Sequence, residues 1–302
     1  MPRMRLAITL LVGVLAARGL AAQGLDSTRR ARECPSCAEW NAPHAPFRVF
    51  GNTWYVGTAG LSAILVTGKD GHVLIDGGLP ESAPLIAASI RAAGFDPKDV
   101  KLIVNSHAHY DHAGGIAELQ RLSGARVVAS EASAAEIASG RATRDDPQYA
   151  LALPYPAAKE VATLHDGDTL RVGDVALVAH LTGGHTPGGT TWSWRSCEGS
   201  RCANLVYADS FTPVSDEDFL FTRNATYPRV LDDFERSFAL LDTLPCDLLL
   251  TPHPGASRLW ERLARRDAGN ASALLAPGQC AAYAATGRAA VAARVAREKG
   301  GR

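Results

Sequence analysis

The stretch that decides the fold is residues 105–115, which read Asn-Ser-His-Ala-His-Tyr-Asp-His-Ala-Gly-Gly. It follows a short apolar run that predicts a strand, and it leads into a run that predicts a helix. In extended backbone, side chains two residues apart point the same way, so we expect His107, His109 and Asp111 to face one site. The turn into the helix brings His112 towards the same space, and we expect the two glycines after it to let the backbone fold sharply.

These four side chains predict a metal site. Three imidazoles and one carboxylate within six residues are ligands that zinc prefers. An isolated histidine is more often a core or surface residue. Four ligands at this spacing, at the end of a strand, are hard to explain in that way.

Two more histidines stand where other loops can deliver them to the same place. His185 lies in Thr-Gly-Gly-His-Thr-Pro-Gly-Gly (182–189), and His253 lies in Thr-Pro-His-Pro-Gly (251–255). Both follow strand-like runs and stand among glycine and proline, where functional loops are expected. Six ligands are enough for two zinc ions that share an activated water, a chemistry that needs no nucleophilic serine. The remaining histidines with no such setting are read as solvated or structural: His44, His72, His165 and His180.

The rest of the chain predicts an α+β protein with two mixed halves. Short β-rich runs at 47–50, 54–56, 62–66 and 72–75 predict an antiparallel meander of hairpins. Strands and helices then alternate, and further strand-like runs are followed by an amphipathic helix at 231–244. No linker separates the halves, which favours one four-layer domain with two packed sheets and helices outside them.

The N-terminus predicts export. Residues 1–22 combine two early arginines, an apolar run and small residues before a polar stretch, which is the layout of a cleaved secretory signal peptide. The apolar run is shorter than the roughly 20 residues that span a bilayer, so cleavage is favoured over a membrane anchor. We expect an N-terminal arm at 23–45 and the domain at 46–302. Lys+Arg and Asp+Glu are both 31, which offers no general attraction to nucleic acid or to a membrane. A periplasmic monomer is expected.

If the chain is exported, the six cysteines are expected to form disulfides, because disulfides persist outside the cytosol. Cys197 and Cys202 flank a short turn between two strand-like runs, so local pairing is easy. A bridge from Cys246 to Cys280 would fasten the last helix to the core. The Cys-Pro-Ser-Cys sequence at 34–37 is open to a redox or zinc-binding interpretation, but a local structural disulfide is preferred because a strand before it and a second cysteine pair are missing.

The motif His-x-His-x-Asp-His followed by Gly-Gly resembles the signature of the metallo-β-lactamase superfamily, and the match extends through the His185 and His253 segments. Within it, the sequence is similar to subclass B3 metallo-β-lactamases. The shared segments are Trp-Asn-Ala-Pro at 40–43, Tyr-Val-Gly-Thr at 55–58 and Ala-Asp-Ser at 208–210. The Cys197–Cys202 turn and the Cys246–Cys280 pair fit several of these enzymes. The resemblance covers nearly the whole chain after Phe47 and implies an αβ/βα sandwich with the metals between the sheet edges.

By this resemblance the first zinc would bind His107, His109 and His185, and the second would bind Asp111, His112 and His253. The implied activity is hydrolysis of the β-lactam amide bond of penicillins, cephalosporins and carbapenems by a metal-bound hydroxide, which gives antibiotic resistance. Asp111 would be both a ligand and the catalytic group that orients the nucleophile.

The resemblance also implies substrate contacts. Ser210 and Thr212 would bind the carboxylate of the drug, although Thr212 stands where serine is common. Gln148 and Tyr149 follow Asp-Asp-Pro at 145–147 and are equally well read as groove residues or as ordinary loop residues.

Two alternatives remain. Glyoxalase II-like thioesterases and lactonases of the same superfamily share the histidine motif and add an aspartate that bridges the metals, and Asp209 stands in about the right segment. The Ala-Asp-Ser segment, the predicted export and the N-terminal segments favour the lactamase. A non-catalytic zinc-binding protein is less favoured, because a degenerate member should have lost ligands and all six are present.

Overall fold

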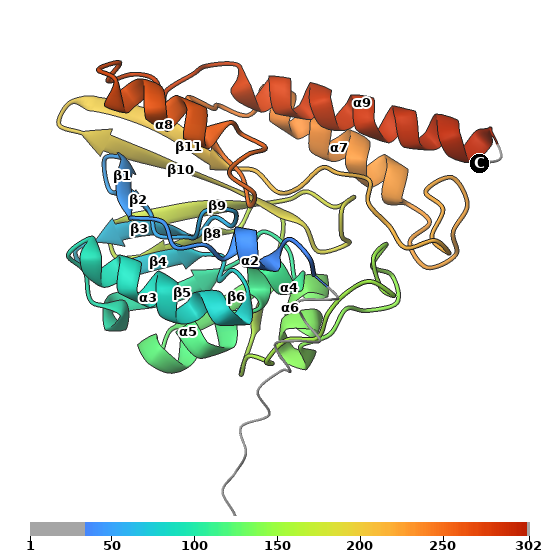
Figure 1. The fold of residues 1–302 in the computed structure, drawn as a ribbon, viewed down its shortest axis with the longest axis horizontal. Helices are drawn as coiled ribbons and strands as arrows, with labels where there is room; N and C mark the ends of the chain where they lie inside the picture. Colours follow the sequence, from blue (N-terminus) through green and yellow to red (C-terminus); the bar gives the residue numbers. More distant parts are fainter. Residues whose placement is uncertain (1–33, 301–302) are drawn as a thin grey trace, which may run out of the picture. The chain divides into compact units, whose positions relative to one another are not determined.

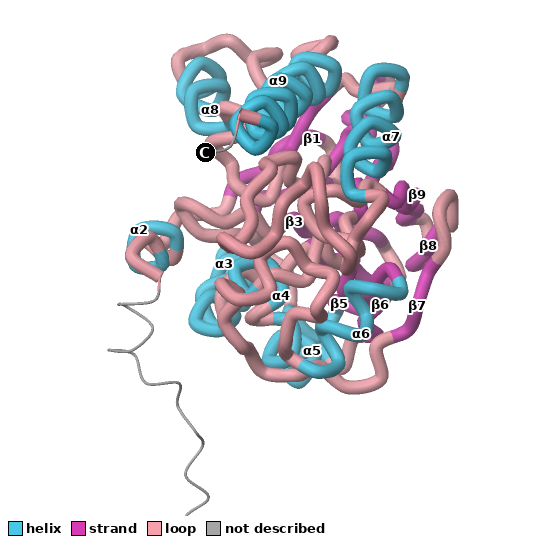
Figure 2. The backbone as a smooth tube through the Cα atoms, turned by 90° about the vertical axis from the view of Figure 1, so that its right-hand side faces the viewer, coloured by secondary structure: helices cyan, strands magenta, loops and turns pink. Residues whose placement is uncertain are grey.

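Two mixed β-sheets pack face to face and carry helices on their outer faces (Figures 1 and 2). The computed structural model describes residues 34–300, and those from Ser36 onward form one compact unit. The predicted signal peptide at 1–22 and residues 23–33 of the predicted arm at 23–45 lie outside the described residues. Residues 36–45 belong to the compact unit and include the short helix α2 (Cys37–Trp40).

The first sheet has seven strands in chain order. They are β1 (Phe47–Phe50), β2 (Thr53–Tyr55), β3 (Ile64–Gly68), β4 (Gly71–Ile75), β5 (Val100–Val104), β6 (Arg126–Ser130) and β7 (Ala162–Leu164). The first four are antiparallel, which confirms the predicted hairpin meander, and β4 to β7 are parallel. Every residue of β4 is buried, because helices cover one face of the strand and the second sheet covers the other.

The second sheet has five strands in the order β12-β11-β10-β9-β8. They are β8 (Thr169–Val172), β9 (Val175–Leu181), β10 (Thr190–Glu198), β11 (Arg201–Tyr207) and β12 (Leu248–Leu250). Only β11 and β12 pair in parallel. In β9 the buried and less buried residues alternate, as the two-residue period of a strand requires.

Helices complete the four layers. Against the first sheet lie α3 (Ala83–Ala92), α5 (Ile116–Ser123) and α6 (Glu131–Ser139), and against the second lie α7 (Val230–Thr243) and α9 (Gln279–Lys299) (Figures 1 and 2). One apolar cluster fills the space between the sheets, and one lies under each helical layer. This arrangement confirms the αβ/βα sandwich. Within residues 34–300, none of the helices combines the length and the apolar character needed to cross a bilayer.

Candidate active site

Loops at one edge of the two sheets carry the six candidate ligands. Two follow β5, two belong to the short helix α4 (Tyr110–Ala113), one lies between β9 and β10, and one follows β12: His107, His109, Asp111, His112, His185 and His253. Backbone hydrogen bonds join the sheets at this edge. The Thr190 N–H donates to the Ser106 carbonyl (2.7 Å), and the Ser62 N–H donates to the Pro252 carbonyl (2.8 Å). The loops are therefore fixed relative to one another.

The glycines after His112 are needed for space. Gly114 has φ −57° and ψ −37°, and Gly115 has φ −87° and ψ −7°, values open to any residue. A Cβ on Gly114 would lie 2.2 Å from the Tyr110 carbonyl oxygen, and one on Gly115 would lie 2.2 Å from that of Gly77. The glycines are therefore required by close packing rather than by their backbone conformation. The glycines let α4 pack directly against the loop after β4, and this close packing fixes His112.

The ligands form two groups of three. His107, His109 and His185 make the first group, and their donor atoms lie within 4.8 Å of one another. The second group contains Asp111, His112 and His253, and its donor atoms meet the same limit. The groups adjoin, because the ring centroids of His107 and His112 are 4.5 Å apart.

In the second group, one carboxylate oxygen is shared. Oδ2 of Asp111 lies 3.2 Å from Nε2 of His112 and 3.3 Å from Nε2 of His253. Burial raises the pKa of Asp111, but the charge of His112 and the hydrogen bonds from both histidines outweigh it, and the pKa falls well below its usual range. Asp111 is therefore ionised at neutral pH, which is the form that binds a metal.

Most of the histidine rings are oriented by an oxygen behind them. The contacts are His107 Nδ1 to Asp209 Oδ1 (2.8 Å), His109 Nε2 to Asp146 Oδ2 (2.9 Å), His185 Nδ1 to the Thr212 carbonyl (2.8 Å) and His253 Nδ1 to the Gly60 carbonyl (3.2 Å). Such partners fix the tautomer and the ring orientation of metal-binding histidines, and they make the other nitrogen a better ligand.

Two of the three rings in the first group are in the neutral form that binds a metal. Burial lowers the pKa of His107 well below its usual value and lowers that of His185 to about 3, so both rings are neutral and keep a free lone pair. His109 differs. Burial lowers its pKa, but the charge of Asp146 and its hydrogen bond outweigh burial and raise the pKa to about 9. A metal ion would displace a proton from this ring at neutral pH.

A buried atom without a partner completes the test of fit. Nε2 of His107 is shielded from solvent and makes no hydrogen bond, although it lies among other imidazoles. A buried polar atom is normally satisfied, and a cation bound by the first group would satisfy this one. The described residues thus contain two His-rich metal-binding sites.

Both groups lie in one pocket of about 450 Å³. The remaining lining residues come from many segments of the chain: Trp40, Tyr110, Gln148, Leu151, Ala152, Ser210, Thr212, Val214, Ala256 and Tyr283. The pocket can take a small molecule whose reacting bond lies over the metal sites.

The structure brings three of the four predicted substrate residues to this pocket. Ser210 and Thr212 line it, and the Thr212 carbonyl also holds His185. Gln148 lines it too, with its amide nitrogen 3.4 Å from Nε2 of His185. Tyr149 lines a neighbouring hollow instead, and the guanidinium of Arg144 lies 5.5 Å from its ring centroid.

Trp40 is a pocket residue that sequence reasoning placed in the N-terminal arm. Its ring centroid lies 5.0 Å from that of His253, and its carbonyl accepts hydrogen bonds from Thr58 Oγ1 (2.7 Å) and from the Gly60 N–H (3.0 Å). The segments Trp-Asn-Ala-Pro and Tyr-Val-Gly-Thr therefore contact each other beside the second group. This contact is the physical reason for the two motifs, and the motifs were the available signal.

Asp76 is another functional residue that sequence reasoning missed. It follows β4, has a φ of +65°, and accepts hydrogen bonds from the Ser106 N–H (2.7 Å), Ser106 Oγ (2.8 Å) and Tyr207 Oη (2.6 Å). Its Oδ2 lies 4.0 Å from Nδ1 of His112. A left-handed backbone is costly for a residue other than glycine, and these hydrogen bonds hold it there. The available signal was an aspartate placed between a buried strand and two glycines.

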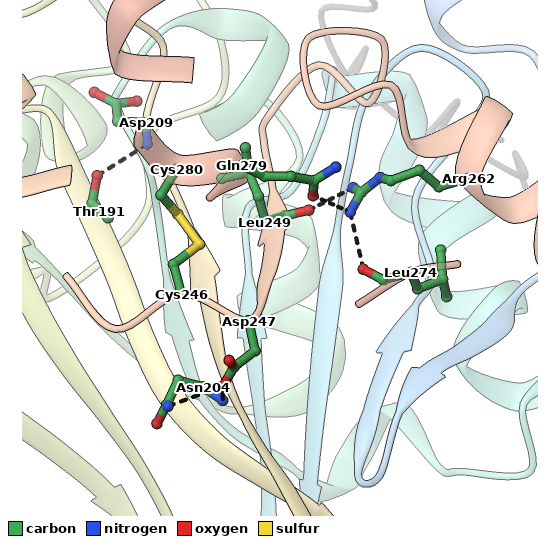
Figure 3. The surroundings of a disulfide bond; sticks show 10 residues. All are labelled: Thr191, Asn204, Asp209, Cys246, Asp247, Leu249, Arg262, Leu274, Gln279 and Cys280. Carbon is green, nitrogen blue, oxygen red and sulfur yellow. Dashed lines mark hydrogen bonds between the residues drawn. A yellow bond between two sulfur atoms is a disulfide. The ribbon is translucent and has the colours of Figure 1, made fainter. Parts of the chain in front are cut away.

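Disulfides hold parts of the second sheet and its helices. Cys197 pairs with Cys202 across the β10–β11 hairpin, and Cys246 pairs with Cys280 at the start of α9 (Figure 3). Cys34 and Cys37 are disulfide-bonded as well, and none of the six cysteines is free. The Cys246–Cys280 bond lies just before β12, the strand that leads to His253.

Comparison with known proteins shows which family and which solved structures this chain resembles. A family model described as the metallo-beta-lactamase superfamily matches residues 57–278. The Rm3 metallo-beta-lactamase has a TM-score of 0.87 at 53% sequence identity, covering 88% of this chain and 99% of that chain. MEM-A1, a subclass B3 metallo-beta-lactamase isolated from a soil metagenome library, has a TM-score of 0.85 at 43% identity, covering 87% of this chain and 100% of that chain.

Curated sequences show a second similarity. A hydroxyacylglutathione hydrolase of Anaeromyxobacter dehalogenans (strain 2CP-C) is 34% identical over 131 residues, which is 43% of this chain and 40% of that protein. This chain spans less than half the length of the curated relatives that it matches.

Proposed function

The chain belongs to the metallo-β-lactamase superfamily, and we propose that it is a zinc-dependent hydrolase that opens the β-lactam ring. Two adjoining groups of three ligand atoms at the base of one pocket carry this proposal. Likeness to subclass B3 enzymes along nearly their whole length supports it. We further propose export to the periplasm as a monomer, where the activity would protect the cell from penicillins, cephalosporins and carbapenems.

The residues of the pocket would have different roles in this reaction. Two zinc ions at these groups would polarise the lactam carbonyl and supply an activated water at neutral pH. Asp111 contacts both neighbouring histidines through Oδ2, which leaves Oδ1 to accept a proton of that water and to orient it. Hydroxyl groups of Ser210 and Thr212 lie on the pocket wall, where they can donate hydrogen bonds to the carboxylate of the substrate.

The thioesterase alternative depends on Asp209. In that reading Asp209 bridges the two metals, whereas here it is fully buried and its Oδ1 bonds Nδ1 of His107, while Nε2 of the same ring is the nitrogen without a partner. Asp209 therefore orients a ligand from behind. This contact favours the lactamase, while the partial match to hydroxyacylglutathione hydrolases keeps a thioester in the test.

The test is hydrolysis by the purified mature protein. A chromogenic cephalosporin, a carbapenem, a thioester and a lactone are compared, with added zinc and after chelation. We expect fast, zinc-dependent opening of both lactams, lost in His107→Ala and kept in His165→Ala, whose imidazole is exposed and lies outside both groups. Cleavage of the thioester or lactone with no lactam turnover by the zinc-loaded protein would overturn the proposal.

A further inference from the structure

Two loops form adjacent parts of the pocket wall. The 143–152 loop contributes Gln148 and Leu151, and the 212–222 loop contributes Thr212 and Val214. Each loop also holds a ligand of the first metal group. Asp146 in the 143–152 loop bonds His109, and the Thr212 carbonyl accepts a hydrogen bond from His185.

One residue joins the two loops. The Asp216 N–H donates to the Pro147 carbonyl (2.9 Å), and Asp216 Oδ2 accepts a hydrogen bond from the Ala150 N–H (3.0 Å). The other oxygen, Oδ1, accepts from the N–H groups of Asp218 (3.1 Å) and Phe219 (3.0 Å) and so closes a turn within its own loop. Asp216 thus separates two tasks between its two carboxylate oxygens.

The far side of the 212–222 loop is fixed to α9. Arg294 donates from Nη2 to Ser215 Oγ (2.8 Å) and to the Phe219 carbonyl (3.2 Å), and from Nε to Glu298 (2.6 Å). Glu298 in turn accepts a hydrogen bond from the Thr222 N–H (2.8 Å). With this loop held to a long helix, the bonds of Asp216 fix the Pro147–Ala150 part of the 143–152 loop against it.

Exposed apolar side chains gather on the same two loops. In the part of the chain that the structure describes, four large hydrophobic residues are well exposed, and three of them are Tyr149, Leu151 and Val214. Leu151 is 56% exposed and Val214 is 46% exposed, and both line the pocket. Exposed apolar surface beside a pocket marks a place where an apolar part of a ligand can bind.

We propose that Asp216 is a positioning residue that fixes the spacing between Leu151 and Val214 and thereby determines the preference for substrates with an apolar substituent. The substrate class rests on the proposed function. Asp216 lies outside the lining of the pocket and acts through the two loops. The first metal group has its own anchors in Asp146 and Thr212, whose hydrogen bonds do not involve Asp216, so loosening the Asp216 contact should weaken binding and leave the chemical step intact.

The test is Asp216→Asn, in which one amide oxygen can still close the turn but the amide NH₂ cannot accept the Ala150 N–H. Asp218→Asn is the matched control, since it removes the same charge from the same loop without touching the other loop. For a penicillin with an aromatic acyl group we expect KM to rise about fivefold, the value of one hydrogen bond. We expect kcat, zinc content and the KM of a penicillin without an acyl group to stay within about twofold, and both KM values to be unchanged in the control.

Equal losses for both penicillins, or loss of zinc, would assign Asp216 a general structural role and overturn the proposal, as would an unchanged KM. Amide hydrogen exchange gives a readout without substrate. Exchange at Ala150 should be faster in Asp216→Asn than in Asp218→Asn, and equal exchange would contradict the inter-loop bond. Absence of lactam turnover in the unaltered protein would instead overturn the proposed function, and the contact between the loops would then be judged by exchange alone.

Discussion

The two metal-binding groups differ in how the protein supports them. In the first, His107 and His109 each contact a buried aspartate, and all three residues are at most 7% exposed. In the second, the side chain of His253 is 34% exposed, and its partner is the main-chain carbonyl of Gly60. Burial raises the pKa of Asp146, but the charge of His109 and its hydrogen bond outweigh burial and lower the pKa, so Asp146 is an ionised acceptor. Hydrogen bonds to a charged acceptor are roughly twice as strong as neutral ones. The first group is therefore the more preorganised, and we expect it to hold its metal more tightly.

The supports also come from different parts of the chain. The first group is held by Asp209 after β11 and by Asp146 and Thr212 of the two pocket-wall loops, through hydrogen bonds that do not involve Asp216. In the second group, the Gly60 carbonyl holds His253 where α2 contacts residues 58–60, and the packing of α4 against the loop after β4 holds His112. A disturbance of one group should therefore leave the other largely intact.

The largest effect is expected from two single variants, each of which removes one ligand from one group. We expect His107→Ala to lower kcat/KM for a chromogenic cephalosporin by about ten-thousandfold and His253→Ala by about a hundredfold, because the second site is the less rigid of the two. Metal content after dialysis should fall for one site in each variant. Equal losses of activity, or loss of both metals from His253→Ala, would contradict the difference between the groups.

The sequence predicted the ligands of this site but not the residues that support them. The ligands are local signals, because the spacing of His107, His109 and Asp111 and the glycine-rich setting of His185 can be read directly. Their supports are distant in the chain. Asp209 lies 102 residues from His107, and main-chain carbonyls such as that of Gly60 carry no sequence signal at all.

The fold shows the same limit. Strands and helices with clear periodicity were predicted close to their bounds, but α8 (Leu259–Asp267) was missed. One cause is Arg262, which counts as polar in any pattern yet is fully buried. Its guanidinium donates to the carbonyls of Leu249 (2.6 Å) and Leu274 (3.1 Å) and to Gln279 (2.6 Å), so it joins α8, β12 and the start of α9 (Figure 3). Only the tertiary structure supplies such acceptors.

A second test concerns Glu136, a buried glutamate near Asp146, which supports His109 of the first metal group. Glu136 is 3% exposed, and burial together with the charge of Asp146 raises its pKa from 4.5 to about 7. The folded state therefore binds more protons than the unfolded state between these pH values. Stability from this group is complete below about pH 4.5 and is lost as the pH rises to about 7, a change of about 3 kcal/mol.

The measurement is urea unfolding of the metal-free protein across this pH range. The free energy of unfolding of the unaltered protein should fall by about 3 kcal/mol relative to that of Glu136→Gln as the pH rises. Glu131→Gln, an exposed change in the same helix, should follow the unaltered protein. Parallel pH profiles for the unaltered protein and Glu136→Gln would show that Glu136 titrates normally.

The smallest expected effect removes only the charge behind one ring. Asp146→Asn keeps an oxygen that can accept from Nε2 of His109, but it loses the ionised partner. We expect the metal affinity of the first site to fall between about tenfold and a hundredfold at pH 9, with the second site unchanged. Asp145→Asn, the neighbouring residue without a contact to a ligand, is the control.

The pH dependence of this loss provides the sharper test. In the unaltered protein Asp146 raises the pKa of His109 to about 9, so at pH 7 a metal ion must displace a proton from that ring. Asp146→Asn relieves this competition, because without the carboxylate the same burial lowers the pKa. The difference in affinity between the two proteins should therefore be smaller at pH 7 than at pH 9, as measured by competition with a chelator. A difference independent of pH would mean that Asp146 only orients the ring, and that its charge contributes nothing to the contrast between the two groups.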